Sequence, residues 1–322
     1  MGMQRSLYTL QTGVFWAHFF DRLGYRLVLT PSTNGRISSA GIESMTAETC
    51  YPVKVSHGHV GELLGKTRFI FLPGIVTMPT PVEQETGFTC PLVQANPFMV
   101  RAALGIGGQG VLNPILHLKH DLSTLALELA EQMAASIRRS RRRIREAAEA
   151  ALEEQRRFNH ALFEKGREVL ESHDPAEPMV VVTGRPYNLY DERLNLHLGR
   201  NLAKIGTAAV PMDFIDVSSV DLGDFPNMYW ALGAQILRTA KFIRSRPNVF
   251  GLHLTNFSCG ADSFIEHFYR YIMQEKPCLI LELDEHSAMA GVMTRLEAFR
   301  NVLDHTMRRP ESGVRASGRV SD

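Results

Sequence analysis

Apolar and polar positions alternate between two patterns over the first part of the chain. Short continuous apolar runs predict strands at residues 5–10, 25–30 and 67–75. Between the first two runs, apolar residues recur at helical spacing from 13 to 24 and end at Gly24, a residue suited to ending a helix. Strands that alternate with helices form parallel sheets covered by helices. We therefore predict an N-terminal α/β lobe over residues 1–120.

The pattern changes in the middle of the chain, over residues 121–175. Up to residue 172 this segment is rich in Ala, Leu, Glu and Arg and contains no proline. That composition favours one long helix or two consecutive helices. We interpret the segment as a helical connector, and the two prolines of the run 173–178 mark its end.

The strand and helix pattern returns in a second lobe, predicted over residues 176–306. Apolar runs predict strands at 178–184, 207–212, 248–257 and 277–284. Helical spacing predicts helices at 193–206, 227–247, 261–276 and 289–306. The tail 307–322 has almost no large apolar residues and is predicted to be disordered. The predicted fold class is therefore α/β, with two Rossmann-like lobes of mostly parallel sheet joined by a long helical connector.

Composition and charge narrow the class of protein. The chain has 322 residues, 44% of them hydrophobic, as in ordinary globular proteins of two domains. No apolar run approaches the roughly 20 residues of a membrane span, and the N-terminus lacks a secretory signal, so we expect a cytoplasmic location and no membrane partner. The basic run 137–145 is flanked by acidic residues and lacks aromatic residues. It indicates a solvated helix face, so we expect no nucleic acid partner.

Four cysteines are too few for a disulfide framework in a chain of this length. Cys50, Cys90 and Cys259 each lie in a break just before a predicted helix, where the helix dipole favours the thiolate form. Thiolates are the ligands of iron–sulfur clusters. The pattern alone leaves two alternatives open: a shared metal centre, or three unrelated buried cysteines. Cys278 lies inside an apolar strand and is predicted to be a buried core residue of a central strand.

Several stretches of the sequence resemble a known family in both content and order. The chain is similar to the 2-hydroxyacyl-CoA dehydratase family, and within it to the proteins described as acyl-CoA dehydratase activase-related or 2-hydroxyglutaryl-CoA dehydratase-like. The matching stretches are TCYPVKVSHGHV at 49–60, TCPLVQANPFMV at 89–100, 183–206 together with VPMDF at 210–214, LTNFSCGADSF at 254–264, and 275–299.

The resemblance implies a cofactor and a partner. In that family, three cysteines hold a [4Fe–4S] cluster, which implies Cys50, Cys90 and Cys259 as ligands here. The partner is an ATP-hydrolysing activator protein with its own iron–sulfur cluster, which supplies one electron at low potential. Related proteins often carry an ATP-binding module upstream, whereas this sequence begins at the first lobe and has no phosphate-cradling glycine motif. We therefore expect a separate activator.

The resemblance also implies a reaction class, with the alternatives left open. It implies ketyl-radical dehydration or reduction of a CoA thioester or similar small molecule, by a lyase like the (R)-2-hydroxyacyl-CoA dehydratases or by a component of an ATP-dependent reductase. The first alternative is an accessory electron-transfer subunit, and the second is a non-enzymatic α/β binding module. The oligomeric state stays open, with a dimer as one alternative.

Four further residues are candidates for the chemistry. Arg185, Tyr187 and Asn188 follow a predicted strand, at the sheet edge where α/β proteins bind ligands, and Arg185 could pair with a carboxylate or phosphate. A structured loop with a buried arginine pair is the equal alternative. His286 follows the last strand and could serve as general acid for a leaving hydroxyl group. Its alternative is a place in a helix cap formed by Asp284 or Ser287.

Overall fold

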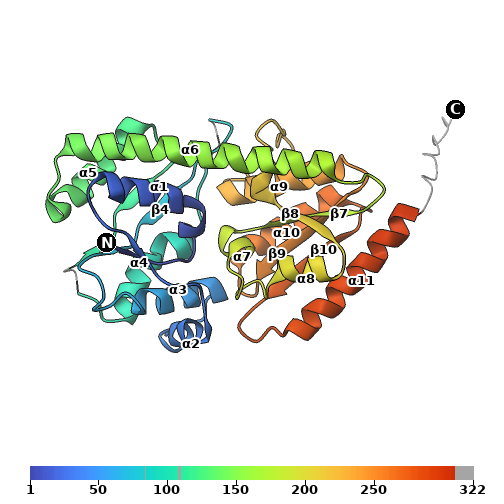
Figure 1. Cartoon of the computed structure of the whole chain (residues 1–322), viewed down its shortest axis with the longest axis horizontal. Helices are drawn as coiled ribbons and strands as arrows, with labels where there is room; N and C mark the ends of the chain where they lie inside the picture. Colours follow the sequence, from blue (N-terminus) through green and yellow to red (C-terminus); the bar gives the residue numbers. More distant parts are fainter. Residues whose placement is uncertain (84, 108–109, 309–322) are drawn as a thin grey trace.

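The computed structural model describes residues 1–83, 85–107 and 110–308. Within these residues it contains two four-stranded parallel sheets, of order β2-β1-β3-β5 and β10-β9-β7-β8, and a two-stranded parallel sheet of β4 and β6. Helices lie around both larger sheets (Figure 1). The predicted fold class is therefore confirmed: two α/β lobes of parallel sheet joined by a helical connector.

The N-terminal lobe is built from very short strands and longer helices. Its elements are β1 (Gly2–Met3), α1 (Thr9–Arg22), β2 (Val28–Leu29), α2 (Gly35–Glu43), α3 (Tyr51–Gly61), β3 (Ile70–Phe71), β4 (Gly74–Thr77), α4 (Pro91–Ala103), β5 (Val111–Leu112) and β6 (Ile115–His117). The strand predicted at 5–10 is wrong. The first strand lies at Gly2–Met3, and Thr9 already begins α1, because a short apolar run before a helix does not distinguish a strand from a buried helix start.

Two glycines allow helices α2 and α3 to cross in close contact. A Cβ atom on Gly58 of α3 would overlap the backbone carbonyl of Ile37 in α2, and one on Gly41 of α2 would overlap the carbonyl of Lys54 in α3. Only glycine permits such an approach of two backbones. The crossing fixes α3 along its length, and with it the position of Cys50 at its start.

The connector consists of two consecutive helices, α5 (Leu122–Ile137) and α6 (Arg141–Ser172). The Asp121 side chain caps α5, and Arg138 ends that helix in a left-handed conformation. Figure 1 shows α6 running along both lobes, where it contacts α1 in the first lobe and the short 3-10 helix η1 (Met212–Phe214) in the second. Gly166 permits the second contact, because a Cβ there would overlap the carbonyl of Phe214.

The C-terminal lobe has longer strands. Its elements, besides η1, are β7 (Met179–Gly184), α7 (Pro186–Tyr190), α8 (Leu198–Lys204), β8 (Ala208–Pro211), α9 (Ala231–Arg244), β9 (Val249–Asn256), α10 (Gly260–Met273), β10 (Cys278–Leu283) and α11 (Met289–Arg308). Every residue of β7 and of the neighbouring strand β9 is buried. A buried strand of this kind is expected when helices cover both faces of a parallel sheet.

Three predictions for this lobe need correction. The helix predicted at 193–206 is confined to α8, because the residues before it form turns closed by hydrogen bonds to the side chain of Asp191. Cys278 begins the edge strand β10 and is only partly buried, so it is not in a central strand. The tail predicted to be disordered begins within the last turn of α11, and its residues 309–322 lie outside the described residues.

The two lobes share buried packing and polar contacts. One continuous apolar core includes Cys50 and Cys90 from the first lobe together with Tyr187 from the second. Lys54 of α3 forms an ion pair with Glu285 after β10, with 2.6 Å between nitrogen and oxygen. The cysteines of the first lobe therefore lie at the contact between the lobes. Among the described helices, none is long and apolar enough to span a membrane.

Candidate functional site

Three cysteines occupy the same structural position in three different helices. Cys50 is the N-cap residue of α3, Cys90 of α4 and Cys259 of α10, and all three have extended backbone conformations. Proline in the first turn of α3 and of α4 starts those helices without loss of a backbone hydrogen bond. Ser258, just before the third cysteine, has a φ of 65°, a left-handed conformation that is uncommon for serine. Each thiol therefore lies beside the unpaired backbone N–H groups of a helix start.

All three thiols are buried, with exposed fractions of 4% for Cys50, 9% for Cys90 and 7% for Cys259. Burial raises the pKa of Cys50 to about 11 and that of Cys259 to about 12. A backbone N–H at each helix start favours the thiolate, but the loss of hydration outweighs it. The expectation of lowered thiol pKa values is therefore wrong for these two residues.

A buried ion pair lies among the thiols. Arg185 donates from Nε and Nη2 to one carboxylate oxygen of Asp262, at 3.1 and 2.8 Å, and Thr255 donates to the other oxygen at 2.7 Å. Both partners of the pair are 1% exposed. The guanidinium of Arg185 favours the thiolate form of Cys50 more than the Asp262 carboxylate opposes it, whereas at Cys259 the carboxylate has the larger effect and favours the protonated thiol.

Two tyrosines complete the surroundings of the thiols. The rings of Tyr8 and Tyr187 lie 6.4 Å apart, and both side chains are buried. Burial raises the pKa of Tyr8 to about 12 and that of Tyr187 well above its usual value. Burial is the main cause of the raised pKa of Tyr187, and the charge of Arg185 opposes it. The hydroxyl of Tyr8 is buried, and the backbone of Cys90 and the side chain of Arg185 favour its ionised form against the larger effect of burial.

The other candidate residues take different positions. Arg185 is held in the buried pair, which was the alternative to a ligand-binding role. Asn188 is buried and donates to the carbonyl of Leu254 at 3.2 Å, while its side-chain oxygen receives no hydrogen bond from the described residues. His286 is exposed, and its backbone N–H donates to the Asp284 side chain. Ser287 also donates to that carboxylate, so His286 lies in a tight turn before α11.

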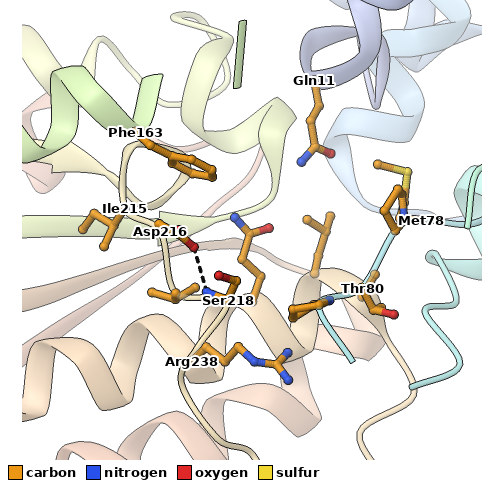
Figure 2. Close-up of a pocket in the computed structure, with 14 residues that line it drawn as sticks. Gln11, Met78, Thr80, Phe163, Ile215, Asp216, Ser218 and Arg238 are labelled. Atoms are coloured by element: carbon orange, nitrogen blue, oxygen red, sulfur yellow. Dashed lines mark hydrogen bonds between the residues drawn. The ribbon is translucent and has the colours of Figure 1, made fainter. Parts of the chain in front are cut away.

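A cavity of about 400 Å³ lies between the lobes and beneath α6. Figure 2 shows Gln11 and Met78 from the first lobe and Phe163 from α6 around the same space as Ile215 and Arg238 of the second. No cysteine lines this cavity. Met78 nevertheless packs in the same core as Cys50 and Cys90.

Sequence reasoning missed two residues near the thiols, Tyr8 and Asp262. Asp262 stands three residues after Cys259, in the first turn of α10, where an acidic residue also suits the helix dipole. Because the helix dipole already accounts for an acidic residue at this position, the sequence does not indicate that Asp262 pairs with Arg185. Tyr8 lies in a segment that was predicted to be a strand, and nothing in its sequence context indicates a position beside the cysteines.

Comparisons with solved structures give weak likenesses. The chain is 10% identical to a metal-free mutant of a periplasmic metal-binding protein from Candidatus Liberibacter asiaticus, with a TM-score of 0.25 over 95% of this chain and 99% of that one. It is 9% identical to glucosamine-6-phosphate deaminase from Thermotoga maritima, with a TM-score of 0.21 over 95% and 82%. Scores this low support no functional argument.

Comparison with families is more informative. No curated protein matches the sequence. The model of a family described as the CoA enzyme activase uncharacterised domain matches residues 1–215, about two thirds of the chain. The matched part includes the helices that begin at Cys50 and Cys90, together with Arg185 and Tyr187. This chain therefore belongs to the family of the CoA enzyme activase uncharacterised domain.

Proposed function

We propose that this chain is an iron–sulfur protein whose Cys50, Cys90 and Cys259 hold a [4Fe–4S] cluster for low-potential electron transfer in CoA-thioester chemistry. The observation that carries the proposal is the position of the thiols. Three buried cysteines from segments far apart in the sequence all stand at helix starts, and two of them, Cys50 and Cys90, pack in one core with Tyr187. Unrelated core cysteines have no reason to share this position.

The spacing of the thiols does not suit a single ion. Thiolates on one tetrahedral zinc ion stand about 3.8 Å apart, given zinc–sulfur bonds of about 2.3 Å. The three sulfurs, all within the described residues, do not all lie within 4.8 Å of one another. Thiolates on a four-iron cluster are more widely spaced, and three of them leave one iron without a protein ligand. When bound, such a cluster supplies single electrons at low potential.

The residues around the thiols have separate roles in this proposal. The guanidinium of Arg185, fixed by Asp262, favours the thiolate form of Cys50. Tyr8 and Tyr187 exclude water with their rings and keep their hydroxyl protons at neutral pH. In the enzyme hypothesis, Arg185, Tyr187 and Asn188 orient the substrate, and His286 donates a proton to the leaving hydroxyl group.

The family description supports the CoA and partner parts of the proposal, because it names an activase of CoA enzymes. We propose an ATP-hydrolysing activator protein with its own iron–sulfur cluster as the electron donor, and a small acyl-CoA-like molecule as the substrate. The second candidate function is an electron-transfer subunit that binds no substrate. The burial of all three thiols and their absence from the interlobe cavity favour this second candidate.

The first experiment measures iron and sulfide after anaerobic reconstitution of the whole chain. We expect about four irons per chain in the wild type, and less than half of that in Cys50→Ala, Cys90→Ala and Cys259→Ala. Cys278→Ala is the matched control and should keep its iron, since this residue lies on the edge strand β10. Full iron content in any of the three variants would refute the ligand set.

A second experiment separates the two candidate functions. The reconstituted protein is mixed with ATP, a reductant and a cognate activator, and its reduction is followed together with turnover of 2-hydroxyacyl-CoA thioesters. Reduction with turnover supports the enzyme. Reduction without turnover supports the electron-transfer subunit, and reduction without ATP or activator contradicts the proposed partner.

A further inference from the structure

A second cluster of metal-ligating side chains lies in the N-terminal lobe and contains no cysteine. His117 ends β6, His120 lies in the turn that follows, and Glu128 lies on the second turn of α5. One ligand atom from each residue lies within 4.8 Å of the other two. The two imidazole rings are stacked, with centroids 4.8 Å apart and planes 17° apart.

The spacing of these atoms suits one small cation. Nδ1 of His117 lies 2.9 Å and Nδ1 of His120 lies 3.1 Å from the same oxygen, Oε1 of Glu128. Around a tetrahedral zinc ion with bonds of about 2.0–2.2 Å, neighbouring ligand atoms stand about 3.3 Å apart. These two distances need to lengthen by only a few tenths of an ångström to admit the ion.

Backbone contacts hold Glu128 against β6. The second oxygen of Glu128 accepts the backbone N–H of His117 at 2.9 Å. One helical turn further along α5, the Gln132 amide pairs with both the N–H and the carbonyl of Ile115, each at 2.8 Å. Helix α5 is therefore fixed along β6 by contacts that leave Oε1 of Glu128 and the two Nδ1 atoms facing one another.

We infer that His117, His120 and Glu128 form a binding site for a divalent transition-metal ion such as Zn²⁺. Two imidazoles and one carboxylate select such an ion over Mg²⁺ or Ca²⁺, which prefer oxygen ligands. The ion replaces the two hydrogen bonds to Oε1, and each neutral imidazole then carries its proton on Nε2. The side chains of His117 and His120 are 33% and 45% exposed, so the fourth position on the ion faces water.

The bound ion cross-links β6 to the first helix of the connector. Because it binds the folded chain and not the unfolded one, it raises the unfolding temperature as its concentration rises. This inference is independent of the iron–sulfur proposal, since the two sites share no residue.

Zn²⁺ titration of the metal-free whole chain tests the site, with a competing chromophoric chelator to report the affinity. We expect His117→Ala and His120→Ala each to weaken binding by about tenfold or more. His160→Ala is the matched control, because His160 is an exposed histidine of α6 outside the cluster, and it should leave the affinity unchanged.

Co²⁺ distinguishes this site from the cysteines, which also bind such metals. Nitrogen and oxygen ligands give Co²⁺ weak visible bands, whereas thiolates add an intense near-ultraviolet charge-transfer band. In Cys259→Ala we expect visible bands without the near-ultraviolet band, and we expect them to vanish when the double variant His117→Ala/His120→Ala is made in the same background. Unchanged Zn²⁺ affinity in that double variant, or a Co²⁺ spectrum from thiolates alone, would overturn the inference.

Discussion

The two lobes follow the same pattern of strand and helix, but different contacts fix the positions of their cysteines. In the N-terminal lobe, β1, β2, β3 and β5 have two residues each, so the sheet supplies few backbone hydrogen bonds. In the C-terminal lobe, β9 alone has eight residues, all buried. Cys50 therefore depends on the packing of helix α3 against α2, whereas Cys259 depends on the end of a long strand and on a buried ion pair.

This difference shows that a helix start can be fixed in two ways within one α/β chain. In the first lobe, glycine contacts bring helices together. In the second, the pair of Arg185 and Asp262 connects the end of β7 to the first turn of α10. Disruption of the glycine contacts should affect the helices around Cys50. Disruption of the ion pair should affect the start of α10.

The largest effect is expected from the buried pair of the C-terminal lobe. Asp262→Ala leaves the Arg185 charge buried without its partner, which should lower the free energy of unfolding by about 3–5 kcal/mol. The double variant Arg185→Met/Asp262→Leu, which replaces both charges, should lose less. Urea unfolding followed by circular dichroism measures both. A double variant as unstable as the single one would show that packing, and not charge, holds this position.

A pH effect is expected in the N-terminal lobe. His59 is fully buried between Thr30 and Thr33, and burial lowers its pKa from 6.5 to about 4. The unfolded chain binds a proton at higher pH than the folded chain, so stability is fully present above pH 6.5 and decreases as the pH falls toward 4. The loss should approach roughly 3 kcal/mol at pH 4.

Unfolding at pH 7.5 and pH 4.5 tests this, with His59→Asn as the comparison. The variant cannot titrate at this position, so its stability should depend less on pH across this range. Equal pH dependence in the variant and the wild type would assign the acid sensitivity to other groups.

A smaller effect is expected at the crossing of α2 and α3. Gly58→Ala forces two backbones apart and should cost about 1–3 kcal/mol, as overpacking does. Gly61→Ala in the same helix has open space around it and is the matched control. Hydrogen exchange should show increased opening of α2 and α3 in the first variant only. Equal protection in both variants would contradict the close crossing.

The smallest effect should be a gain in the C-terminal lobe. Gly199 lies inside α8 with open space around it, so Gly199→Ala should add about 0.5–1 kcal/mol through the lower backbone entropy of the unfolded chain. Thermal unfolding measures the gain. A loss of stability instead would indicate that the helix start at His197, which has a φ of 53°, needs this glycine.

Local sequence patterns predicted where the helices and strands lie better than they predicted which of these elements pack together. The alternation of apolar runs and helical spacing predicted both lobes and the connector, because these signals lie within a few consecutive residues. Sheet order depends on long-range pairing, so the edge position of Cys278 could not be predicted. The same holds for Glu128, which meets His117 and His120 only because α5 turns back along β6.

The same difference between local and long-range information applies to the site of the three cysteines. The sequence indicated that Cys50, Cys90 and Cys259 each stand before a helix, and the structure places each one at a helix start. The burial that raises the pKa of two of these thiols comes from side chains of both lobes, among them Tyr8 and Tyr187, and no local pattern reports it.

Helix α6 has a consequence for motion. A helix of 32 residues is about 48 Å long, and this one contacts α1 in one lobe and η1 in the other. A hinge needs a flexible segment, but the only glycine of α6, Gly166, is locked against the Phe214 carbonyl. The rigid helix α6 therefore sets the angle between the lobes. We expect small molecules to enter the interlobe cavity through movements of side chains and loops, and not through opening of the lobes.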